Sequence, residues 1–521
     1  MSTVFDEAIL EQHAEIDLSV LPSLRSEREQ AIVLALDIGT SGTRAALFNE
    51  RGDQIKGSFV AVENQEQEYA ALVSGTDVSA DALVALVAAV LDRAVERAEE
   101  LVSRIDYVAA SCFWHSLIGL DNGGHAVTPL FGWADTRAAT AVDELRERLD
   151  ESKTHARTGC RFHSSYWPAK ILWLKKSAAD VFANVTRWVS FSDYLYNEFF
   201  GSLSTSISMA SATGLLNQTT CNWDEELLAA LEISEAQLPS IAPLRKTAGG
   251  LLEEFMLRWP TLERAAWLQA IGDGAANNIG AGCMSRNQIA LMLGTSGAMR
   301  LLSSRAVPAV QPPELFCYRA DRERVVIGGA LSDGGGLLSW IQKNLAVNYD
   351  ASGLSFNEAL RSYEPDSHGL TILPFWSGER APGWSANATG TIHGLTAATK
   401  SLDIARAAME SIAYRFALIA QPLDSFAPGA MITLTGKIFH SYPAWAQIVS
   451  DVLGRKVELS SVDEASLRGA ALLALETIGT IDSLETIQAE PARAFDPDIK
   501  RHEVYARAIE RQEELYKKLC R

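Results

Sequence analysis

A chain of 521 residues is longer than the roughly 250–300 residues that one hydrophobic core normally supports, so two large domains are expected. Hydrophobic residues make up 47% of the chain and charged residues 21%, and these shares exclude a disordered protein. The formal net charge of -19 argues against a nucleic acid or an anionic membrane as partner, because either would repel the chain.

The six cysteines are scattered without a Cys-x-x-Cys pair, and nothing at the N-terminus resembles a signal peptide. We therefore expect reduced thiols in a cytoplasmic protein. The longest apolar run, residues 82–91, is about half of the ~20 residues that a membrane-spanning helix needs, so no transmembrane segment is expected. No cluster of metal-binding residue types has the spacing of a structural zinc site.

Residues 1–30 are polar and charged, and we predict an N-terminal extension without chemistry there. From Ile32 the pattern predicts a strand, a tight hairpin and a second strand, followed by a long helix over residues 79–102 with Ser79 or Asp81 as its cap. Strands then alternate with helices. This alternation indicates an α/β fold, in which ligands bind at the ends of strands.

One motif, Gly-Thr-Ser-Gly between two apolar strands, occurs twice, at residues 39–42 and 294–297. Each copy predicts a β-hairpin whose turn comes close to a ligand, because glycines remove side chains and the hydroxyl groups add donors to the backbone N–H groups. Such an array suits phosphate oxygens, although a single turn of this kind more often serves tight chain geometry.

The two copies differ in one position. Asp37 stands two residues before the first glycine of the first copy, and Met292 stands there in the second. Asp37 is either a turn-forming residue or a carboxylate that faces Mg²⁺, which takes one or two carboxylates and completes its shell with water and phosphate oxygens. We expect two related halves that face each other across a nucleotide, with the metal on the side of Asp37.

Asp273 lies between two glycines, at the start of a small-residue segment that predicts a helix. One interpretation of this residue is a helix N-cap. The other is a general base, which phosphoryl transfer requires close to the acceptor hydroxyl group. We expect the boundary between the two domains near residue 285, after Asp273 and before the second Gly-Thr-Ser-Gly turn.

Several tryptophans stand beside charged residues, which is typical of a polyol site. In such a site a ring face stacks on C–H groups while polar side chains bind hydroxyl groups. The alternatives are that the tryptophans pack in the core, that Asp135 and Arg137 form an internal ion pair, and that the nearby histidines are structural. The residues concerned are His115, Trp133, Asp135, Arg137, His163, Trp376, Glu379, Arg380 and Trp384.

The second half predicts a hairpin, three helices, a strand and a glycine-rich helix start. The final helix contains Gly469-Ala470-Ala471, small enough for another backbone or a flat ring to approach. The expected ranges are 315–327 for the hairpin, 333–336 for the helix start, 402–419 for the first helix, 431–435 for the strand, 443–453 for the second helix, which Gly454 closes, and 466–475 for the last.

From about residue 32 onward the chain resembles the FGGY carbohydrate kinases of the sugar kinase, Hsp70 and actin ATPase superfamily. Within that family it is most similar to gluconate kinases. The motifs that carry the resemblance, in chain order, are residues 37–42, Trp133-Ala134-Asp135-Thr136-Arg137, Thr158-Gly159 with His163, residues 210–217, Gly272-Asp273-Gly274, Gly294-Thr295-Ser296-Gly297-Ala298 with Arg300, residues 378–382 and Arg468-Gly469-Ala470-Ala471.

The resemblance implies an α/β protein of two ribonuclease-H-like domains that flank a deep cleft with ATP and Mg²⁺. The N-terminal domain, residues 31–285, is expected to hold the sugar, the first phosphate turn and the catalytic base. The C-terminal domain, residues 286–521, is expected to hold the second phosphate turn and the adenosine. The resemblance is also compatible with a homodimer.

The family's functional positions map onto this chain as follows. Asp273 matches the catalytic base, and together with Asp37 it is expected near the metal. The residues expected to bind ATP are Gly39, Thr40, Ser41, Thr43, Arg44, Gly294, Thr295, Gly335, Gly436 and Lys437. Those expected at the sugar are His115, Trp133, Asp135, Arg137, His163 and Asp273.

The chain departs from the family after the strand at 431–435. The family has a run of glycines against the adenosine, whereas this chain has Gly436-Lys437-Ile438. Bulk at Lys437 or Ile438 would crowd a purine, so the mode of nucleotide binding is open.

These observations predict ATP-dependent phosphorylation of a primary hydroxyl group of a small sugar acid or sugar, with D-gluconate as the first choice and 6-phosphogluconate as its product. One alternative acceptor is a pentulose such as xylulose or ribulose, or a polyol such as glycerol. The alternative from another class is a nucleotide-binding relic of the superfamily without kinase activity.

Overall fold

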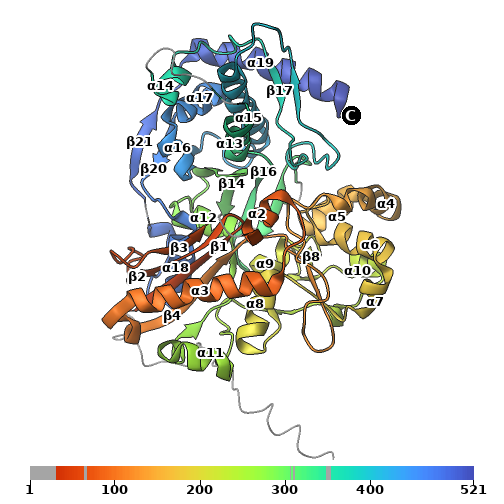
Figure 1. The fold of residues 1–521 in the computed structure, drawn as a ribbon, viewed down its shortest axis with the longest axis vertical. Helices are drawn as coiled ribbons and strands as arrows, with labels where there is room; N and C mark the ends of the chain where they lie inside the picture. The colour runs from red at the N-terminus through yellow and green to blue at the C-terminus, as the bar shows by residue number, and fades with distance from the viewer. Residues whose placement is uncertain are drawn as a thin grey trace, which may run out of the picture.

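The computed structural model describes residues 31–520 except 64–66, 305–306, 309–310, 346, 348–353 and 488. The predicted N-terminal extension, residues 1–30, lies outside the described residues. The chain forms two stacked halves, each built around its own β-sheet (Figure 1). Across the described part of the chain, no helix combines the length and the apolar character that crossing a membrane demands.

The first sheet has six strands and forms the lower half in Figure 1. Its order is β11-β4-β1-β2-β3, with β12 also on β4. β1 and β2 form the antiparallel hairpin that the sequence predicted, and β4 runs parallel to β1. The strands are β1 (Ile32–Gly39), β2 (Gly42–Phe48), β3 (Val60–Glu63), β4 (Ile105–Cys112), β11 (Ala266–Trp267) and β12 (Ile271–Gly272).

The second sheet has seven strands in the order β15-β16-β14-β13-β19-β20-β21 and forms the upper half. β13 and β14 form the second predicted hairpin, and β19 runs parallel to β13 as β4 does to β1. The strands are β13 (Gln288–Leu293), β14 (Gly297–Ser303), β15 (Phe316–Arg319), β16 (Val325–Leu331), β19 (Met431–Thr435), β20 (Val457–Ser460) and β21 (Pro491–Phe495). β1 and β14 are almost wholly buried, as their apolar sequences require.

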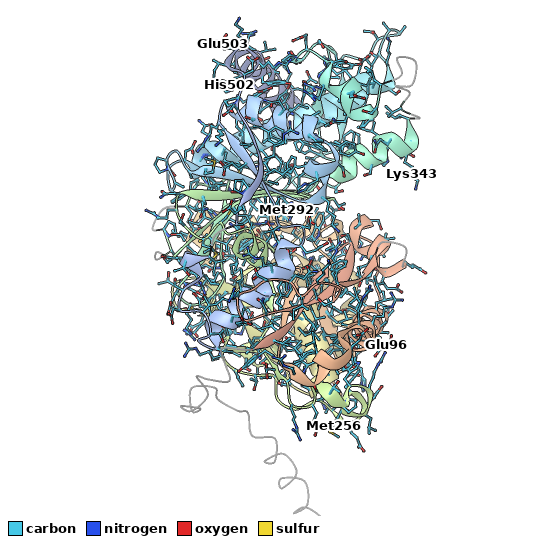
Figure 2. The ribbon with its side chains drawn as sticks, turned by 90° about the vertical axis from the view of Figure 1, so that its left-hand side faces the viewer. Glu96, Met256, Met292, Lys343, His502 and Glu503 are labelled. Atoms are coloured by element: carbon cyan, nitrogen blue, oxygen red, sulfur yellow. The ribbon has the colours of Figure 1, made fainter. Side chains whose placement is uncertain are left out.

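Two helices join the halves. α12 (Asp273–Gly280) and α18 (Ala465–Thr477) pack against each other, and α18, although it comes from the C-terminal part of the chain, contacts β1 and β4 of the first sheet. Their backbones touch, since a Cβ atom on Gly469 would lie 1.8 Å from the Ala276 carbonyl oxygen. The prediction that another backbone approaches Gly469 is therefore correct. Figure 2 shows Met292 of β13 between the lower half, with Glu96 and Met256, and the upper half, with Lys343 and His502.

The remaining helices cover the sheets or form a lobe beside the first sheet. This lobe has a hydrophobic core of its own. In the lower half they are α2 (Gln67–Ser74), α3 (Ala80–Ala98), α4 (Thr140–Arg148), α5 (Glu151–Thr158), α6 (Trp167–Ser177), α7 (Ala179–Asn184), α8 (Phe191–Phe200), α9 (Ile207–Ser211), α10 (Glu225–Leu231) and α11 (Glu253–Arg258). In the upper half they are α13 (Gly335–Asn344), α14 (Phe356–Arg361), α15 (Ser401–Leu423), α16 (Lys437–Ser441), α17 (Pro443–Leu453) and α19 (Ile499–Leu519).

The predicted helix over residues 79–102 is correct at its start and too long at its end. Ser79 is the cap, because its side chain accepts a hydrogen bond from the Ala82 N–H, so the alternative cap Asp81 is wrong. The α-helix ends at Ala98. Glu99 adopts a positive φ of 49°, and the chain continues to Arg104 in 3₁₀ geometry. Four short two-stranded sheets complete the fold: β5 (Ile118–Leu120) with β6 (Arg187–Val189), β7 (Ser204–Ser206) with β10 (Ser240–Ala242), β8 (Leu216–Asn217) with β9 (Asn222–Trp223), and β17 (Thr371–Leu373) with β18 (Thr391–His393).

Candidate active site

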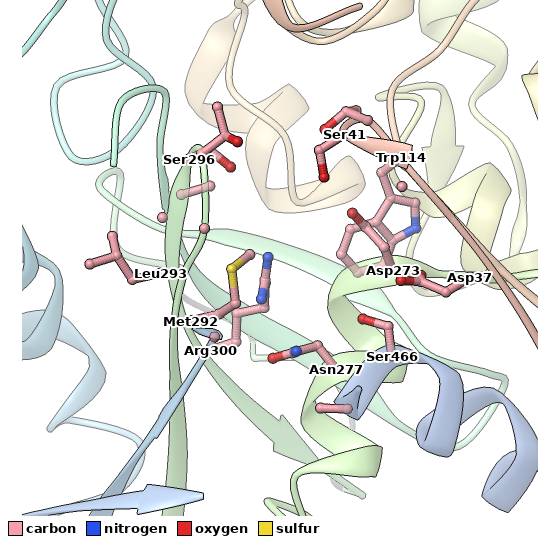
Figure 3. Close-up of a pocket in the computed structure, with 18 of the residues that line it drawn as sticks. Asp37, Ser41, Trp114, Asp273, Asn277, Met292, Leu293, Ser296, Arg300 and Ser466 are labelled. Carbon is pink, nitrogen blue, oxygen red and sulfur yellow. The ribbon is translucent and has the colours of Figure 1, made fainter. Parts of the chain in front are cut away.

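A cleft of about 360 Å³ lies between the two halves, and both hairpin turns line it (Figure 3). Most of the residues that the sequence placed at a ligand meet here, although they come from six separate segments of the chain. The predicted residues that line the cleft are Asp37, Gly39, Thr40, Ser41, Arg44, His115, Trp133, Asp273, Gly294, Thr295, Gly436 and Lys437.

The two Gly-Thr-Ser-Gly turns share letters but differ in geometry. In the first, Gly39 pairs with Gly42, so that only Thr40 and Ser41 form the loop. In the second, Leu293 pairs with Gly297, so the loop has three residues, and the Gly294 N–H donates to the Ser296 carbonyl oxygen at 2.9 Å. Both turns present hydroxyl side chains at the cleft, which suits the binding of phosphate oxygens.

Asp37 ends β1 at the floor of the cleft and is only 7% exposed. One carboxylate oxygen accepts a hydrogen bond from the Ser111 hydroxyl group at 2.9 Å, which β4 places beside it, and the other lies 3.5 Å from Nη1 of Arg44. Burial raises the pKa of Asp37 to about 6, and Asp273 and Glu464 act in the same direction, while Arg44 opposes the rise.

This donor set fits a hard divalent cation. Asp37, Asp273 and Glu464 line one cleft, and the negative charges of Asp273 and Glu464 each raise the pKa of Asp37. Mg²⁺ binds through one or two carboxylates and keeps water and phosphate oxygens for its other positions. An ion beside Asp37 and Asp273 would relieve the repulsion between these two carboxylates.

Asp273 is the first residue of α12, and the N-cap of that helix is Gly272. The interpretation of Asp273 as an N-cap is therefore wrong. Its Oδ1 accepts a hydrogen bond from the Gly274 N–H at 2.8 Å. Burial raises the pKa of the Asp273 carboxyl group, and the positive charge of Arg300 opposes this rise. A partly buried carboxylate at the start of a helix, in the cleft that both Gly-Thr-Ser-Gly turns line, is well placed to take a proton.

Aromatic rings form the other end of the cleft. Tyr318 lies edge to face with both Trp114 and His115, at ring-centroid distances of 5.1 Å and 5.6 Å. The Arg380 guanidinium group lies 4.5 Å from the centroid of the Trp133 ring. Flat rings and N–H donors of this kind suit the C–H and hydroxyl groups of a polyol.

His115 is neutral at this end. Its Nδ1 lies 2.7 Å from the Ala212 carbonyl oxygen, so this nitrogen carries the proton. Burial and the nearby Arg380 charge hold the pKa of His115 well below its usual value.

Three residues expected at the sugar do not line the cleft. Asp135 and Arg137 pair with each other, with Oδ2 of Asp135 2.6 Å from Nη2 of Arg137, and the same Arg137 nitrogen reaches Asp77 at 2.7 Å. The internal ion pair is the correct alternative, because these charges are already satisfied. His163 is buried, and its two ring nitrogens contact the Ser165 hydroxyl group and the Glu379 carbonyl oxygen at 3.0 Å each.

The three residues around the 378–382 motif have structural partners as well. Trp376 lines a neighbouring cavity with Trp340, and Trp384 is 2% exposed and donates to the Glu314 carbonyl oxygen at 3.2 Å. Glu379 is buried against Arg415 and accepts a hydrogen bond from the Tyr516 hydroxyl group at 2.6 Å.

Two residues expected at ATP lie behind the turns instead of in the cleft. The Thr43 hydroxyl group is buried against the Tyr69 hydroxyl group at 2.6 Å. The Gly335 N–H donates to the Gly294 carbonyl oxygen at 2.7 Å, so the start of α13 supports the second turn from outside. Both residues are placed to hold a turn in position.

Gly436 and Lys437 do line the cleft. From the sequence, the adenosine is expected beside them. Gly436 has a φ of 107°, and a Cβ atom there would lie 2.2 Å from the Leu293 carbonyl oxygen, so glycine is required. The Lys437 ammonium group lies 2.7 Å from Glu464.

The structure adds residues to which sequence reasoning gave no role at a ligand. Arg300 of β14, which the sequence analysis named only as part of the resemblance, lines the cleft together with Asp273. Lys170 of α6 is 1% exposed and donates to the carbonyl oxygens of His115, Gly132 and Ser165 at 2.8–2.9 Å. A lysine inside the apolar run 167–174 was its signal. Burial lowers the pKa of Lys170 to about 7.

Comparison with known proteins identifies relatives over nearly the whole chain. Residues 32–280 match the N-terminal domain, and residues 289–477 the C-terminal domain, of the FGGY family of carbohydrate kinases. A gluconokinase of Bacillus subtilis (strain 168) is 27% identical over 467 residues, which cover 87% of this chain and 89% of the relative. A glycerol kinase of Aromatoleum aromaticum is 29% identical over 486 residues, which cover 89% of this chain and 94% of the relative.

Solved structures of two sugar kinases are also similar to this chain over most of its length. The gluconate kinase from Lactobacillus acidophilus matches with a TM-score of 0.80 and 26% identity, covering 94% of this chain and 98% of its own. The ligand-bound xylulose kinase from the same organism also reaches a TM-score of 0.80, at 25% identity and with the same coverage.

Proposed function

This chain belongs to the FGGY family of carbohydrate kinases, and we propose that it transfers the γ-phosphoryl group of ATP to the primary hydroxyl group of D-gluconate, giving 6-phosphogluconate and ADP. The fold is that of the sugar kinase, Hsp70 and actin ATPase superfamily, as the sequence predicted. The observation that carries the proposal is the position of Asp273, a partly buried carboxylate that shares one cleft with both hairpin turns and the aromatic end.

In this mechanism Asp273 takes the proton of the acceptor hydroxyl group as its oxygen attacks phosphorus. The new O–P bond forms while the bond to the leaving ADP oxygen breaks. The backbone N–H and hydroxyl groups of the two turns hold the oxygens of the transferring group, where negative charge develops. Asp37 and Asp273 would hold Mg²⁺, which neutralises charge on the phosphate oxygens when it is bound.

The remaining ligand-binding roles are assigned to residues that line the cleft. We place ATP against Gly39, Thr40, Ser41, Arg44, Gly294 and Thr295, with Gly436 and Lys437 toward the adenosine, and we place the sugar against His115 and Trp133. We keep the domain boundary near residue 285. The two sheets and the two family matches lie on either side of it, which supports this division. Approach of the halves would exclude water, which otherwise competes as acceptor.

We choose D-gluconate as the proposed acceptor because the gluconokinase and gluconate kinase relatives match over almost the full length of the chain. A polyol or a pentulose remains the second candidate, since a glycerol kinase and a xylulose kinase match with similar coverage. A relic that binds nucleotide without transfer is disfavoured by the carboxylates of Asp37 and Asp273, which both line the cleft.

An acceptor panel tests the proposal. Purified protein is incubated with ATP and Mg²⁺ and with D-gluconate, D-xylulose, D-ribulose or glycerol, and ADP formation is followed by a coupled assay. We expect kcat/KM for D-gluconate to exceed that for every other acceptor at least tenfold. A higher value for glycerol or a pentulose would reassign the substrate. ADP formation that is the same with and without any acceptor would favour the relic.

A further inference from the structure

Arg300 is a buried cation without a carboxylate partner. It projects from β14 into the cleft and is only 6% exposed (Figure 3). Its Nε and Nη1 atoms are inaccessible to solvent, and no described group accepts a hydrogen bond from either. Burial lowers the pKa of Arg300 to about 10. A buried guanidinium group with unused N–H donors is costly in free energy unless an anion arrives to pair with it.

The charges around Arg300 favour an incoming anion. The negative charge of Asp273 stabilises the Arg300 cation, and the positive charge of the second buried guanidinium group, that of Arg380, destabilises it. Arg380 donates to the Leu331 carbonyl oxygen at 2.8 Å, and among the described residues neither arginine forms an ion pair with a carboxylate. The charges of Asp273 and Asp333 both stabilise the Arg380 cation, whereas of these two carboxylates only Asp273 acts on Arg300.

The place of Arg300 in the cleft separates it from the phosphate turns. Arg300 stands three residues beyond Gly297 along β14, so the Cα atoms of the two residues are about 10 Å apart at ~3.3 Å per residue. The guanidinium group instead lies at the aromatic end. A Cβ atom on Gly274 would be 2.8 Å from Nε of Arg300 and 2.5 Å from the Trp114 ring, so both side chains border the same point.

We propose that Arg300 recognises the carboxylate group of a sugar-acid substrate and thereby makes the enzyme an aldonate kinase that rejects neutral polyols. The proposal rests on the kinase function assigned above and adds the residue that selects the substrate class. A guanidinium group binds a carboxylate through two parallel N–H donors, which gives both attraction and orientation. A neutral acceptor in the same place leaves the buried donors unpaired.

The test compares two acceptors that differ only at C1. D-Gluconate carries a carboxylate there, and D-glucitol carries a hydroxymethyl group. Binding of each is measured by calorimetry without nucleotide, and kcat/KM is measured with ATP and Mg²⁺, for wild type, Arg300→Met, Arg300→Lys and the control Arg322→Met. Arg322 is exposed and outside the cleft, so its substitution removes one positive charge without touching the site.

The quantity compared is the ratio of kcat/KM for D-gluconate to kcat/KM for D-glucitol. We expect this ratio to be about 100 or more for wild type and Arg322→Met, and below about ten for Arg300→Met. The KM for ATP should change less than threefold. Arg300→Lys keeps the charge but loses the planar pair of donors, so an intermediate ratio is expected. If Arg300→Met does not fold, as circular dichroism would show, the Arg300→Lys ratio decides.

The proposal is overturned if wild type prefers D-gluconate but the variants keep the wild-type ratio while kcat falls equally with both acceptors, or if only the KM for ATP rises. Arg300 would then act on phosphate or on Asp273. If the wild-type enzyme uses another aldonate better than D-gluconate, only the name of the substrate changes. The kcat/KM ratio is then measured with that acid and its alditol, and the same outcomes decide. A wild type that phosphorylates neutral acceptors alone overturns the proposed substrate as well.

Discussion

Asp37 and Met292 occupy equivalent places in the two hairpins and face the same cleft, one with a carboxylate and the other with a thioether. Asp37 pairs with Arg44 across the first hairpin, and Met292 pairs with Ala298 across the second. Both lie two residues before the first glycine of their turn. Of the two hairpins, only the first therefore offers a carboxylate to a cation in the cleft.

Replacing Asp37 by Asn should weaken the Mg²⁺ requirement of the reaction specifically. The amide lacks the negative charge that attracts the ion, so we expect the Mg²⁺ concentration for half-maximal activity to rise by about 10–100-fold. Turnover measured across a Mg²⁺ titration checks this, with Asp53→Asn, an exposed carboxylate near the far end of the same hairpin, as the control. An unchanged Mg²⁺ dependence in Asp37→Asn would remove Asp37 from the metal site.

Arg300→Met should also shift the pH profile. The Arg300 charge lowers the pKa of Asp273, which burial raises. The base must be ionised to accept a proton, so loss of Arg300 raises the pKa of Asp273 and moves the acidic limb of kcat/KM to higher pH. The ratio of kcat/KM at pH 8 to that at pH 6 should increase in the variant. A ratio equal to that of wild type would show that Arg300 does not influence the base.

The contact between α12 and α18 should make Gly469→Ala destabilising. Helix propensity alone predicts that this change stabilises by about 1 kcal/mol, whereas a methyl group 1.8 Å from the Ala276 carbonyl oxygen forces the helices apart and costs about 1–3 kcal/mol. We therefore expect a lower Tm. Gly250→Ala, where a Cβ atom meets nothing within 4 Å, is the matched control and should leave Tm nearly unchanged. A raised Tm in Gly469→Ala would contradict the close packing.

Lys437→Ala should change nucleotide binding only slightly. The lysine side chain is 60% exposed and pairs with Glu464, and exposed ion pairs contribute about 0–1 kcal/mol. The KM for ATP should accordingly change less than about fivefold, and the KM for D-gluconate should stay constant. The exposed Lys343→Ala serves as reference. A KM for ATP that falls tenfold in Lys437→Ala would mean that this side chain obstructs the purine.

Local patterns in the sequence were sufficient for the two hairpins, for the strand at 431–435 and for the helix that Gly454 closes, because each rests on apolar periodicity and on turn or cap residues. The same patterns could not decide between partners that are distant in sequence. Asp135 and Arg137 look like ligands in the sequence, but Asp77, sixty positions away, completes their ion pair. His163 is likewise satisfied by the Glu379 carbonyl oxygen, 216 positions away.

Arg300 illustrates the converse. The motif that carries the resemblance includes Arg300 but gives it no partner, and only the fold shows that Asp273 and Arg380 are its neighbours and that its Nε and Nη1 atoms lack acceptors. Lys170 is similar, since the carbonyl groups that surround it come from three separate loops. Burial and long-range contacts, which decide the chemistry of such side chains, are not encoded in any short segment.

The most direct test of the central claim is the turnover of Asp273→Asn with D-gluconate, ATP and Mg²⁺. Asn keeps the shape of the side chain but cannot take the hydroxyl proton, so we expect kcat to fall by about 10²–10⁴-fold. D-Gluconate binding and Tm should remain close to those of wild type, which separates loss of the base from loss of the fold. A kcat within tenfold of wild type would contradict the assignment of Asp273 as the base.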